Sequence, residues 1–217
     1  MPSLSRFFRE SSLIRVVGGF ALAALVLGAL GWLVTGSYRE YPLAFDNAIR
    51  TAIRQMRSPM WAQLFLAVTK LGSTLYLAII GCVAGIIFIF MRWFRPLLIL
   101  ILVMSGQAAL HHGFKWLIAR PRPSALINYP TTESFSYPSG HAVASLCLYV
   151  TIAWYVAATT DNSAIKVIIA ILTAVLVFLI GMSRVYIGIH YPTDVIAGFV
   201  AAIIWTAAVL STDRRPI

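Results

Sequence analysis

The sequence predicts an all-α fold, an integral membrane bundle of six transmembrane helices with a short interfacial amphipathic helix. Two observations carry this prediction. Of the 217 residues, 60% are hydrophobic and 11% are charged, whereas a soluble domain has about 25% charged residues. The apolar residues also gather in runs near the ~20 residues that a helix needs to cross a bilayer. We therefore expect lipid to solvate most of residues 1–217, as a single transmembrane domain.

Six apolar runs are expected to be the spans. They cover residues 16–35, 71–91, 96–114, 142–160, 167–183 and 195–212. The first run follows basic residues, as the core of a signal peptide does, but it is longer than the roughly 7–15 residues of such a core. It is therefore expected to be a retained anchor.

The loop after the first run carries a separate amphipathic pattern. Apolar residues recur there at helical spacing, at Phe45, Ile49, Ile53 and Met56. An adjoining face carries Arg50, Arg54 and Arg57. This pattern predicts a short helix along the membrane interface. It serves either as a surface anchor or as a helix whose arginines gather anions.

The net charge of +10 is concentrated at the ends of the apolar runs. That distribution suits anionic lipid headgroups, and no sequence motif for nucleic-acid binding accompanies it. Cys82 and Cys147 lie inside apolar runs without a partner at metal-ligand spacing, so we interpret them as packing residues. The adjacent His111 and His112 are likewise expected to make packing or interfacial contacts.

Three polar stretches stand out against this apolar background. They contain Lys115 and Arg122, then Ser139, Gly140 and His141, and finally Arg184, His190 and Asp194. Charged groups are costly near lipid, so their presence there suggests a functional site. The two loops that hold them fall on the same side of the membrane when the six spans alternate, which allows them to build one site.

Each stretch has groups suited to a phosphate. Lys115 and Arg122 supply two cations, and an arginine binds phosphate oxygens in a bidentate manner. Read alone, such cations are also typical headgroup anchors, and Arg120 fits that anchor role better than the site. Ser139 and Gly140 precede the fourth span, whose first N–H groups form an anion cradle with His141 at its edge. A plain capped turn is the alternative.

The last stretch combines a cation with an imidazole and a carboxylate. Asp194 follows His190 closely enough to hydrogen-bond one ring nitrogen, which fixes the tautomer and leaves the other nitrogen electron-rich. Arg184 adds a third fixed cation. The alternative is an interfacial turn with a local Asp–His bond.

The order Lys-x6-Arg-Pro, Pro-Ser-Gly-His and Ser-Arg-x5-His-x3-Asp resembles the signature of the type 2 phosphatidic acid phosphatase superfamily. The resemblance implies that His190 is the nucleophile, that Asp194 orients it, and that His141 protonates the leaving oxygen and then activates water. Five further residues would hold the phosphate: Lys115, Arg122, Ser139, Gly140 and Arg184.

We therefore expect an integral membrane phosphatase that hydrolyses lipid phosphate monoesters or pyrophosphates through a phosphohistidine. Phosphatidate, phosphatidylglycerol phosphate and undecaprenyl pyrophosphate are the substrates that the resemblance suggests. No metal or other cofactor is expected, because three cations can neutralise the phosphate and Asp194 is the one carboxylate among the motif residues. The expected partners are membrane lipids, not nucleic acid. The alternative is a non-enzymatic lipid or anion transporter that uses the same basic pocket.

Basic residues in short loops set the expected sidedness. The tight turn with Arg92 and Arg95 and the basic amino terminus favour cytoplasmic termini in the cell (inner) membrane. The site would then face the periplasmic or extracellular side. Four arginines in the loop after the first span argue for the opposite orientation.

Overall fold

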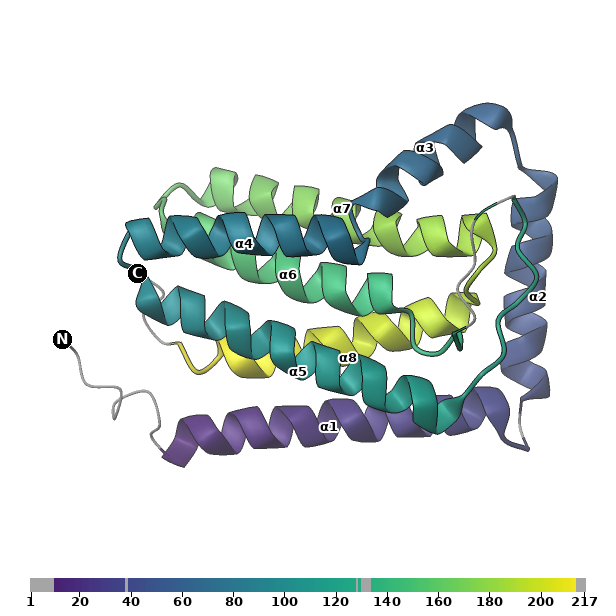
Figure 1. The fold of residues 1–217 in the computed structure, drawn as a ribbon, viewed down its shortest axis with the longest axis horizontal. Coiled ribbons are helices and arrows are strands. Elements are labelled where there is room, and N and C mark those ends of the chain that lie inside the picture. The colour runs from purple at the N-terminus through teal and green to yellow at the C-terminus, as the bar shows by residue number, and fades with distance from the viewer. Residues whose placement is uncertain (1–9, 38, 128, 130–133, 214–217) are drawn as a thin grey trace.

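The structure is a computed structural model that describes residues 10–37, 39–127, 129 and 134–213. Throughout these ranges the regular structure is helical and contains no strand. The basic residues before position 10, on which part of the sidedness prediction rests, lie outside them. The helices are α1 (Glu10–Thr35), α2 (Glu40–Gln55), α3 (Pro59–Lys70), α4 (Thr74–Phe90), α5 (Phe94–Ile118), α6 (Gly140–Ala158), α7 (Ser163–Ile187) and α8 (Pro192–Leu210) (Figure 1).

Five of these helices, α1, α5, α6, α7 and α8, are long and apolar enough to cross a membrane. The sixth candidate is the pair α3 and α4, which meet at a 48° bend and form one broken span when counted together. The predicted six-span layout is therefore confirmed with one difference. The sequence analysis assigned residues 71–91 to this span and did not anticipate α3, because its polar and charged residues shorten the continuous apolar run.

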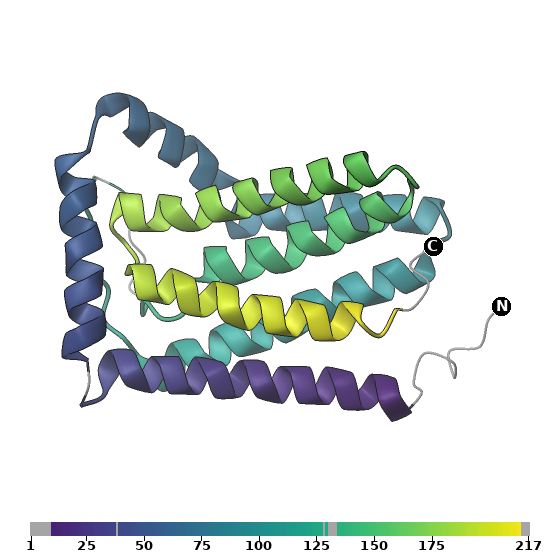
Figure 2. The ribbon, with the colours of Figure 1, turned by 180° about the vertical axis from the view of Figure 1, so that it is seen from behind.

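The predicted amphipathic helix is α2, and it lies across one end of the bundle in both views (Figures 1 and 2). At this end α5 and α7 finish and α6 and α8 begin. Ile49 and Ile53 of α2 pack against a small cluster that consists of Ala142, Val185 and Val195. Phe45 and Met56 are exposed, as expected for residues that meet an interface. The apolar face of α2 is thus partly covered by the bundle and partly exposed.

The core of the bundle is built on α8. Trp205 of α8 is buried, and its Nε1 donates to the carbonyl of Val103 on α5 at 2.9 Å. Phe20 of α1 meets the Trp205 ring edge-on at 5.5 Å between centroids. The indole lies directly on Gly106 of α5, where a Cβ would overlap the ring. One aromatic side chain therefore joins three spans, and its position requires a residue without a side chain on the facing helix.

Gly106→Ala tests this packing. The added methyl must displace the Trp205 ring and strain its hydrogen bond, so we expect a loss of about 1–3 kcal/mol in unfolding free energy. Thermal unfolding in detergent measures the change as a lower Tm. Gly113→Ala on the same helix is the matched control, because a Cβ there meets no atom within 4 Å. Equal Tm values for the two variants would contradict the packing described.

Candidate active site

The three polar stretches meet at the end of the bundle that α2 covers (Figure 2). Lys115 is in the last turn of α5, and Ser139 directly precedes α6. Gly188 ends α7 in the left-handed conformation, with φ 91°, and the chain then passes through His190 into α8. Because both loops connect neighbouring helices at the same end, they lie on one side, as the alternation of spans predicted.

His190 lies between α7 and α8 and is 2% exposed. Its Nδ1 is 3.5 Å from Oδ2 of Asp194, a separation that is longer than a usual hydrogen bond. The same Oδ2 accepts from the backbone N–H of Tyr191 at 2.9 Å, so Asp194 also caps the start of α8. The carboxylate therefore faces one ring nitrogen, and Nε2 faces away from it.

Arg122 occupies the other side of the imidazole. Its Nη1 is 3.2 Å from Nε2 of His190 and donates to the carbonyl of Ile189 at 2.9 Å. Its Nε donates to the carbonyl of Ser134 at 2.7 Å, which holds the guanidinium from the opposite direction. A phosphate oxygen bound to this arginine would thus lie beside Nε2.

Lys115 points into the same region from α5. Its Nζ is 3.5 Å from both the Pro138 carbonyl and Nε2 of His111. A Cβ at Gly140 would lie 2.7 Å from that same His111 nitrogen, so a larger residue at the start of α6 would have to displace the His111 ring. His111 therefore lines the candidate site, which the sequence analysis missed. The signal was its spacing of four residues from Lys115, which puts both on one face of a helix.

Ser139 and His141 bring polar atoms that lack partners. Ser139 holds the N-cap position of α6, but its hydroxyl makes no capping bond, and its backbone N–H donates to the Asp194 carbonyl at 3.1 Å. Oγ of Ser139 and Nε2 of His141 are buried without a hydrogen-bond partner among the described residues. This differs from the simple capped turn considered above.

Arg184 completes the candidate site from α7. Its Nη1 donates to Oγ1 of Thr69 on α3 at 2.6 Å, and its guanidinium lies 5.5 Å from the centre of the Tyr129 ring. Its Nε is buried without a partner among the described residues. Thr69 is a further residue that sequence reasoning missed, since it belongs to the helix that was not anticipated.

Unsatisfied polar atoms concentrate at this site. Within the described ranges, five buried side-chain nitrogen or oxygen atoms lack a hydrogen-bond partner. Four of them belong to predicted site residues, namely Ser139, His141, Arg184 and His190. Buried polar atoms are normally paired, and unpaired ones are costly. Nδ1 of His190 faces Asp194, whereas the atoms of Ser139, His141 and Arg184 face no partner and could be satisfied by a polar ligand.

The electrostatics of the site favour a neutral imidazole. Burial lowers the pKa of His190 to about 4, and Arg184 and Arg122 act in the same direction. The nearby Asp194 opposes this shift without cancelling it. His190 is therefore neutral at pH 7, with a lone pair available on one ring nitrogen.

Arg120 is buried, and the interpretation of this residue as a headgroup anchor is wrong. Its Nη1 donates to Oδ1 of Asp194 at 2.6 Å and to Oγ1 of Thr193 at 2.8 Å. Its Nη2 donates to Oδ2 of Asp46 on α2 at 2.8 Å. Burial lowers the pKa of Arg120, but the carboxylates of Asp194 and Asp46 outweigh this effect and raise it overall. Asp46 was missed because its partner lies far along the chain.

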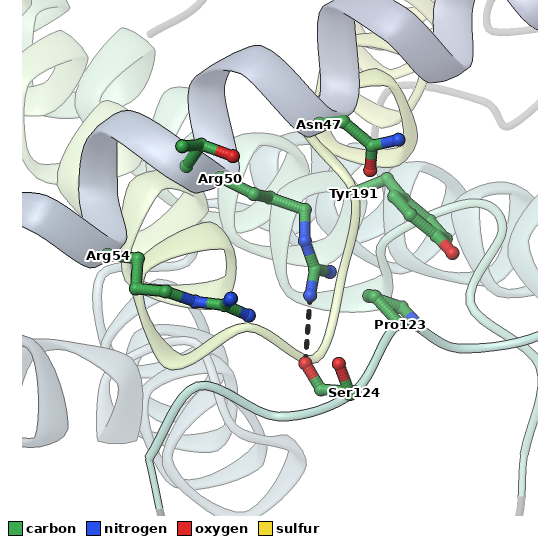
Figure 3. Close-up of a pocket in the computed structure, with 7 residues that line it drawn as sticks. Asn47, Arg50, Arg54, Pro123, Ser124 and Tyr191 are labelled. Atoms are coloured by element: carbon green, nitrogen blue, oxygen red, sulfur yellow. Dashed lines mark hydrogen bonds between the residues drawn. The ribbon is translucent and has the colours of Figure 1, made fainter.

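Arg50 of α2 also differs from the expectation of a free, anion-gathering side chain. It donates to the carbonyl of Ser124 at 2.9 Å (Figure 3). It also donates to the carbonyl of Gly188 at 3.4 Å, and so ties α2 to both loops. Beside it is a hollow of about 290 Å³, lined by Asn47, Arg50, Thr51, Arg54, Pro123, Ser124 and Tyr191. Arg54 is exposed at this hollow and is still suited to attract anions.

The described residues contain no group of three or more His, Cys, Asp or Glu side chains placed to hold a metal ion. The charged groups that converge at the candidate site are mainly cations, from Lys115, Arg122 and Arg184. The single carboxylate that faces them, Asp194, is already paired with Arg120.

Comparison with known proteins shows the family of this chain. The family model of the PAP2 superfamily matches residues 96–216, which include all three polar stretches. Phosphatidylglycerophosphatase B of Bacillus subtilis (strain 168) is 31% identical over 173 residues, which cover 78% of this chain and 84% of that protein. An undecaprenyl-diphosphatase of Sulfolobus acidocaldarius is 32% identical over 122 residues, 54% of this chain and 55% of that protein.

Two solved structures are similar over most of the fold. The crystal structure of a transmembrane PAP2-type phosphatidylglycerolphosphate phosphatase from Bacillus subtilis has a TM-score of 0.73 at 27% identity, over 90% of this chain and 94% of that chain. Aquifex aeolicus LpxE has a TM-score of 0.59 at 25% identity, over 76% of this chain and 93% of that chain. This multi-pass membrane protein belongs to the PAP2 superfamily of phosphatases, hydrolases of phosphate esters.

Proposed function

We propose that this protein hydrolyses a lipid phosphate monoester or pyrophosphate through a phosphohistidine formed on His190, without a metal. One observation carries the proposal. His190 is buried and neutral, with the Asp194 carboxylate on its Nδ1 side and the Arg122 guanidinium at Nε2. A nucleophile with an orienting carboxylate on one side and a phosphate-binding cation on the other has the parts that phosphoryl transfer needs.

In the first step Nε2 of His190 attacks the phosphorus in line with the leaving oxygen. The N–P bond forms as the P–O bond to the lipid breaks, and a proton on His141 passes to the leaving oxygen. The phosphorylated ring keeps the proton on Nδ1 and becomes positively charged. Asp194 stabilises this charge from 3.5 Å, as the aspartate of a Ser-His-Asp triad stabilises its imidazolium.

In the second step His141, now neutral, takes a proton from water as the water oxygen attacks the phosphorus. The N–P bond breaks, phosphate is released, and His190 returns to its neutral form. His141 is protonated again and ready for the next cycle. The buried Nε2 of His141, which has no partner in the described chain, is the atom that would move this proton.

The remaining polar groups would hold the three equatorial oxygens. Lys115, Arg122 and Arg184 neutralise the phosphate charge, and fixed cations act strongly in a site that excludes water. The hydroxyl of Ser139 and the backbone N–H groups at Gly140 donate further hydrogen bonds. Arg122 would exchange its contact with Nε2 for a phosphate oxygen when substrate binds.

The location of the site supports an amphiphilic substrate. The motif residues lie at the end of the spans beneath an amphipathic helix, the depth of a lipid headgroup. The relatives named above act on phosphatidylglycerol phosphate and on undecaprenyl diphosphate, according to their names. We propose phosphatidate, phosphatidylglycerol phosphate and undecaprenyl pyrophosphate as the substrates to test.

Phosphate release from these three lipids tests the proposal. Wild-type protein in detergent with EDTA is expected to release phosphate from at least one of them. His190→Ala is expected to lower kcat by at least about 10³-fold, because it removes the nucleophile. His112→Ala is the matched control, since this exposed histidine lies on the same segment as His111 and outside the candidate site.

Two outcomes would overturn the proposal. Activity that needs an added divalent metal would contradict the cation-only mechanism. Lipid flux that survives His190→Ala in reconstituted vesicles, without phosphate release by the wild type, would identify a transporter instead.

The protonation state of His190 provides a separate test. Because burial lowers its pKa to about 4, the imidazole is expected to stay neutral from pH 8 down to about pH 5. Nitrogen-15 histidine NMR in micelles reports this state, and the His190→Ala spectrum assigns the signal. A titration midpoint near the ordinary value of about 6.5 would show that the site is more solvated than described.

We also propose that the protein lies in the cell membrane with cytoplasmic termini and the site facing outward. Thr51→Cys, on exposed α2, and Asp161→Cys, in the exposed turn before α7, report the two ends of the bundle in a Cys82→Ser background. A membrane-impermeant maleimide is expected to label the first variant in intact cells and the second only after permeabilisation. The reverse pattern would invert the orientation.

A further inference from the structure

We propose that Asp46 and Arg120 are positioning residues that fix Asp194 against His190, which makes α2 a functional part of the active site. We call the three side chains the Asp46–Arg120–Asp194 clamp. The inference rests on the proposed function of His190 and extends it to a helix outside the motif stretches.

The two carboxylate oxygens of Asp194 have different partners. Oδ1 accepts from Arg120 at 2.6 Å, while Oδ2 accepts from the Tyr191 N–H at 2.9 Å and faces His190 at 3.5 Å. Asp194 is fully buried, so no water is available to replace a lost partner. The carboxylate therefore cannot rotate without breaking two strong contacts, and the oxygen that faces the imidazole is determined.

Arg120 is itself held rigidly. Its guanidinium lies 3.9 Å from the centre of the Tyr191 ring, and its two terminal nitrogens donate to Asp194, Thr193 and Asp46. It is 5% exposed, and its side-chain hydrogen bonds go to Thr193, Asp194 and Asp46 rather than to any phosphate-binding residue. An arginine with this set of partners positions other groups and does not bind the substrate.

Asp46 anchors the outer end of the clamp. Its Oδ1 accepts from the Thr193 backbone N–H at 2.9 Å, and its Oδ2 accepts from the Thr193 hydroxyl at 2.7 Å and from Arg120. The Thr193 N–H is in the first turn of α8, where backbone donors lack helical partners. A carboxylate from α2 thus caps the helix that begins directly after His190, which couples the placement of α2 to the nucleophile.

The charges of the clamp act on His190 in opposite directions. Asp194 favours the protonated imidazole, and by the sign of its charge Asp46 acts in the same direction and Arg120 in the opposite one. The other charged or titratable groups near His190 are Arg122 from the loop, Arg184 from α7, His141 from α6 and His111 from α5. None of these groups contacts Asp46 or Arg120 in the described structure. Substitutions of Asp46 or Arg120 therefore change the electrostatic field at His190 without removing a contact of these other groups.

Asp46→Asn and Arg120→Gln test the clamp. Asp46→Asn keeps the shape of the side chain and removes its charge, and Arg120→Gln removes the guanidinium. Each is expected to lower kcat about 10–100-fold, as loss of an outer-shell partner does elsewhere, with KM within about twofold. The pH midpoint of His190, read by NMR, is expected to fall in Asp46→Asn and to rise in Arg120→Gln. Arg120→Lys, which keeps the charge, is expected to restore part of the lost kcat.

Glu40→Gln is the control, because Glu40 is an exposed acid on the same helix and makes no clamp contact. It should retain wild-type kcat. Wild-type kcat in Asp46→Asn, or a loss of activity that follows Tm while the His190 midpoint stays fixed, would overturn the clamp. If Arg120→Gln does not fold, Asp46→Asn and Arg120→Lys decide the question. Activity that survives in His190→Ala would instead overturn the function proposed above.

Discussion

A fully buried carboxylate requires a cation, and the pairing of Asp194 with Arg120 meets this requirement at the centre of the molecule's polar end. Asp194 lies in the first turn of α8, and Arg120 follows α5, so the ion pair fixes two of the membrane-spanning helices relative to each other. Asp46 neutralises the remaining side of the guanidinium and brings α2 across the helix ends. The candidate active site, the entry into α8 and the placement of α2 all depend on this one set of charges.

The same constraint explains the other polar contacts at this end. Arg184 reaches a hydroxyl on α3, and Arg50 reaches two loop carbonyls, because a cation near lipid must find acceptors within the protein. These contacts join the bent span and the interfacial helix to the loops. The atoms left unsatisfied belong mostly to the residues that the motif spacing singled out. The structural cations are paired here, whereas Ser139, His141 and Arg184 of the candidate site each keep one buried polar atom without a partner in the described chain.

Much of this arrangement could be predicted from the sequence, and the exceptions have physical reasons. Apolar runs report spans directly, because a span through lipid must be mostly apolar, and the motif spacing placed Asp194 close enough to His190 to face its ring. Arg120 and Asp46 escaped prediction because they are 74 residues apart, and only the folded chain brings them together. His111 could have been predicted as a site residue, since its spacing from Lys115 follows the helical repeat. The sequence analysis did not predict α3, because its polar residues separate it from the apolar run that forms α4.

The excess of positive charge at this end has a consequence for turnover. If the site works as proposed, inorganic phosphate offers the same oxygens as the bound ester and keeps the attraction of all three cations after the lipid has left. The inorganic phosphate product therefore stays bound, and its release competes with cleavage of the ester to be the rate-limiting step of the cycle. A catalyst built from fixed cations is in this way prone to inhibition by its own smaller product.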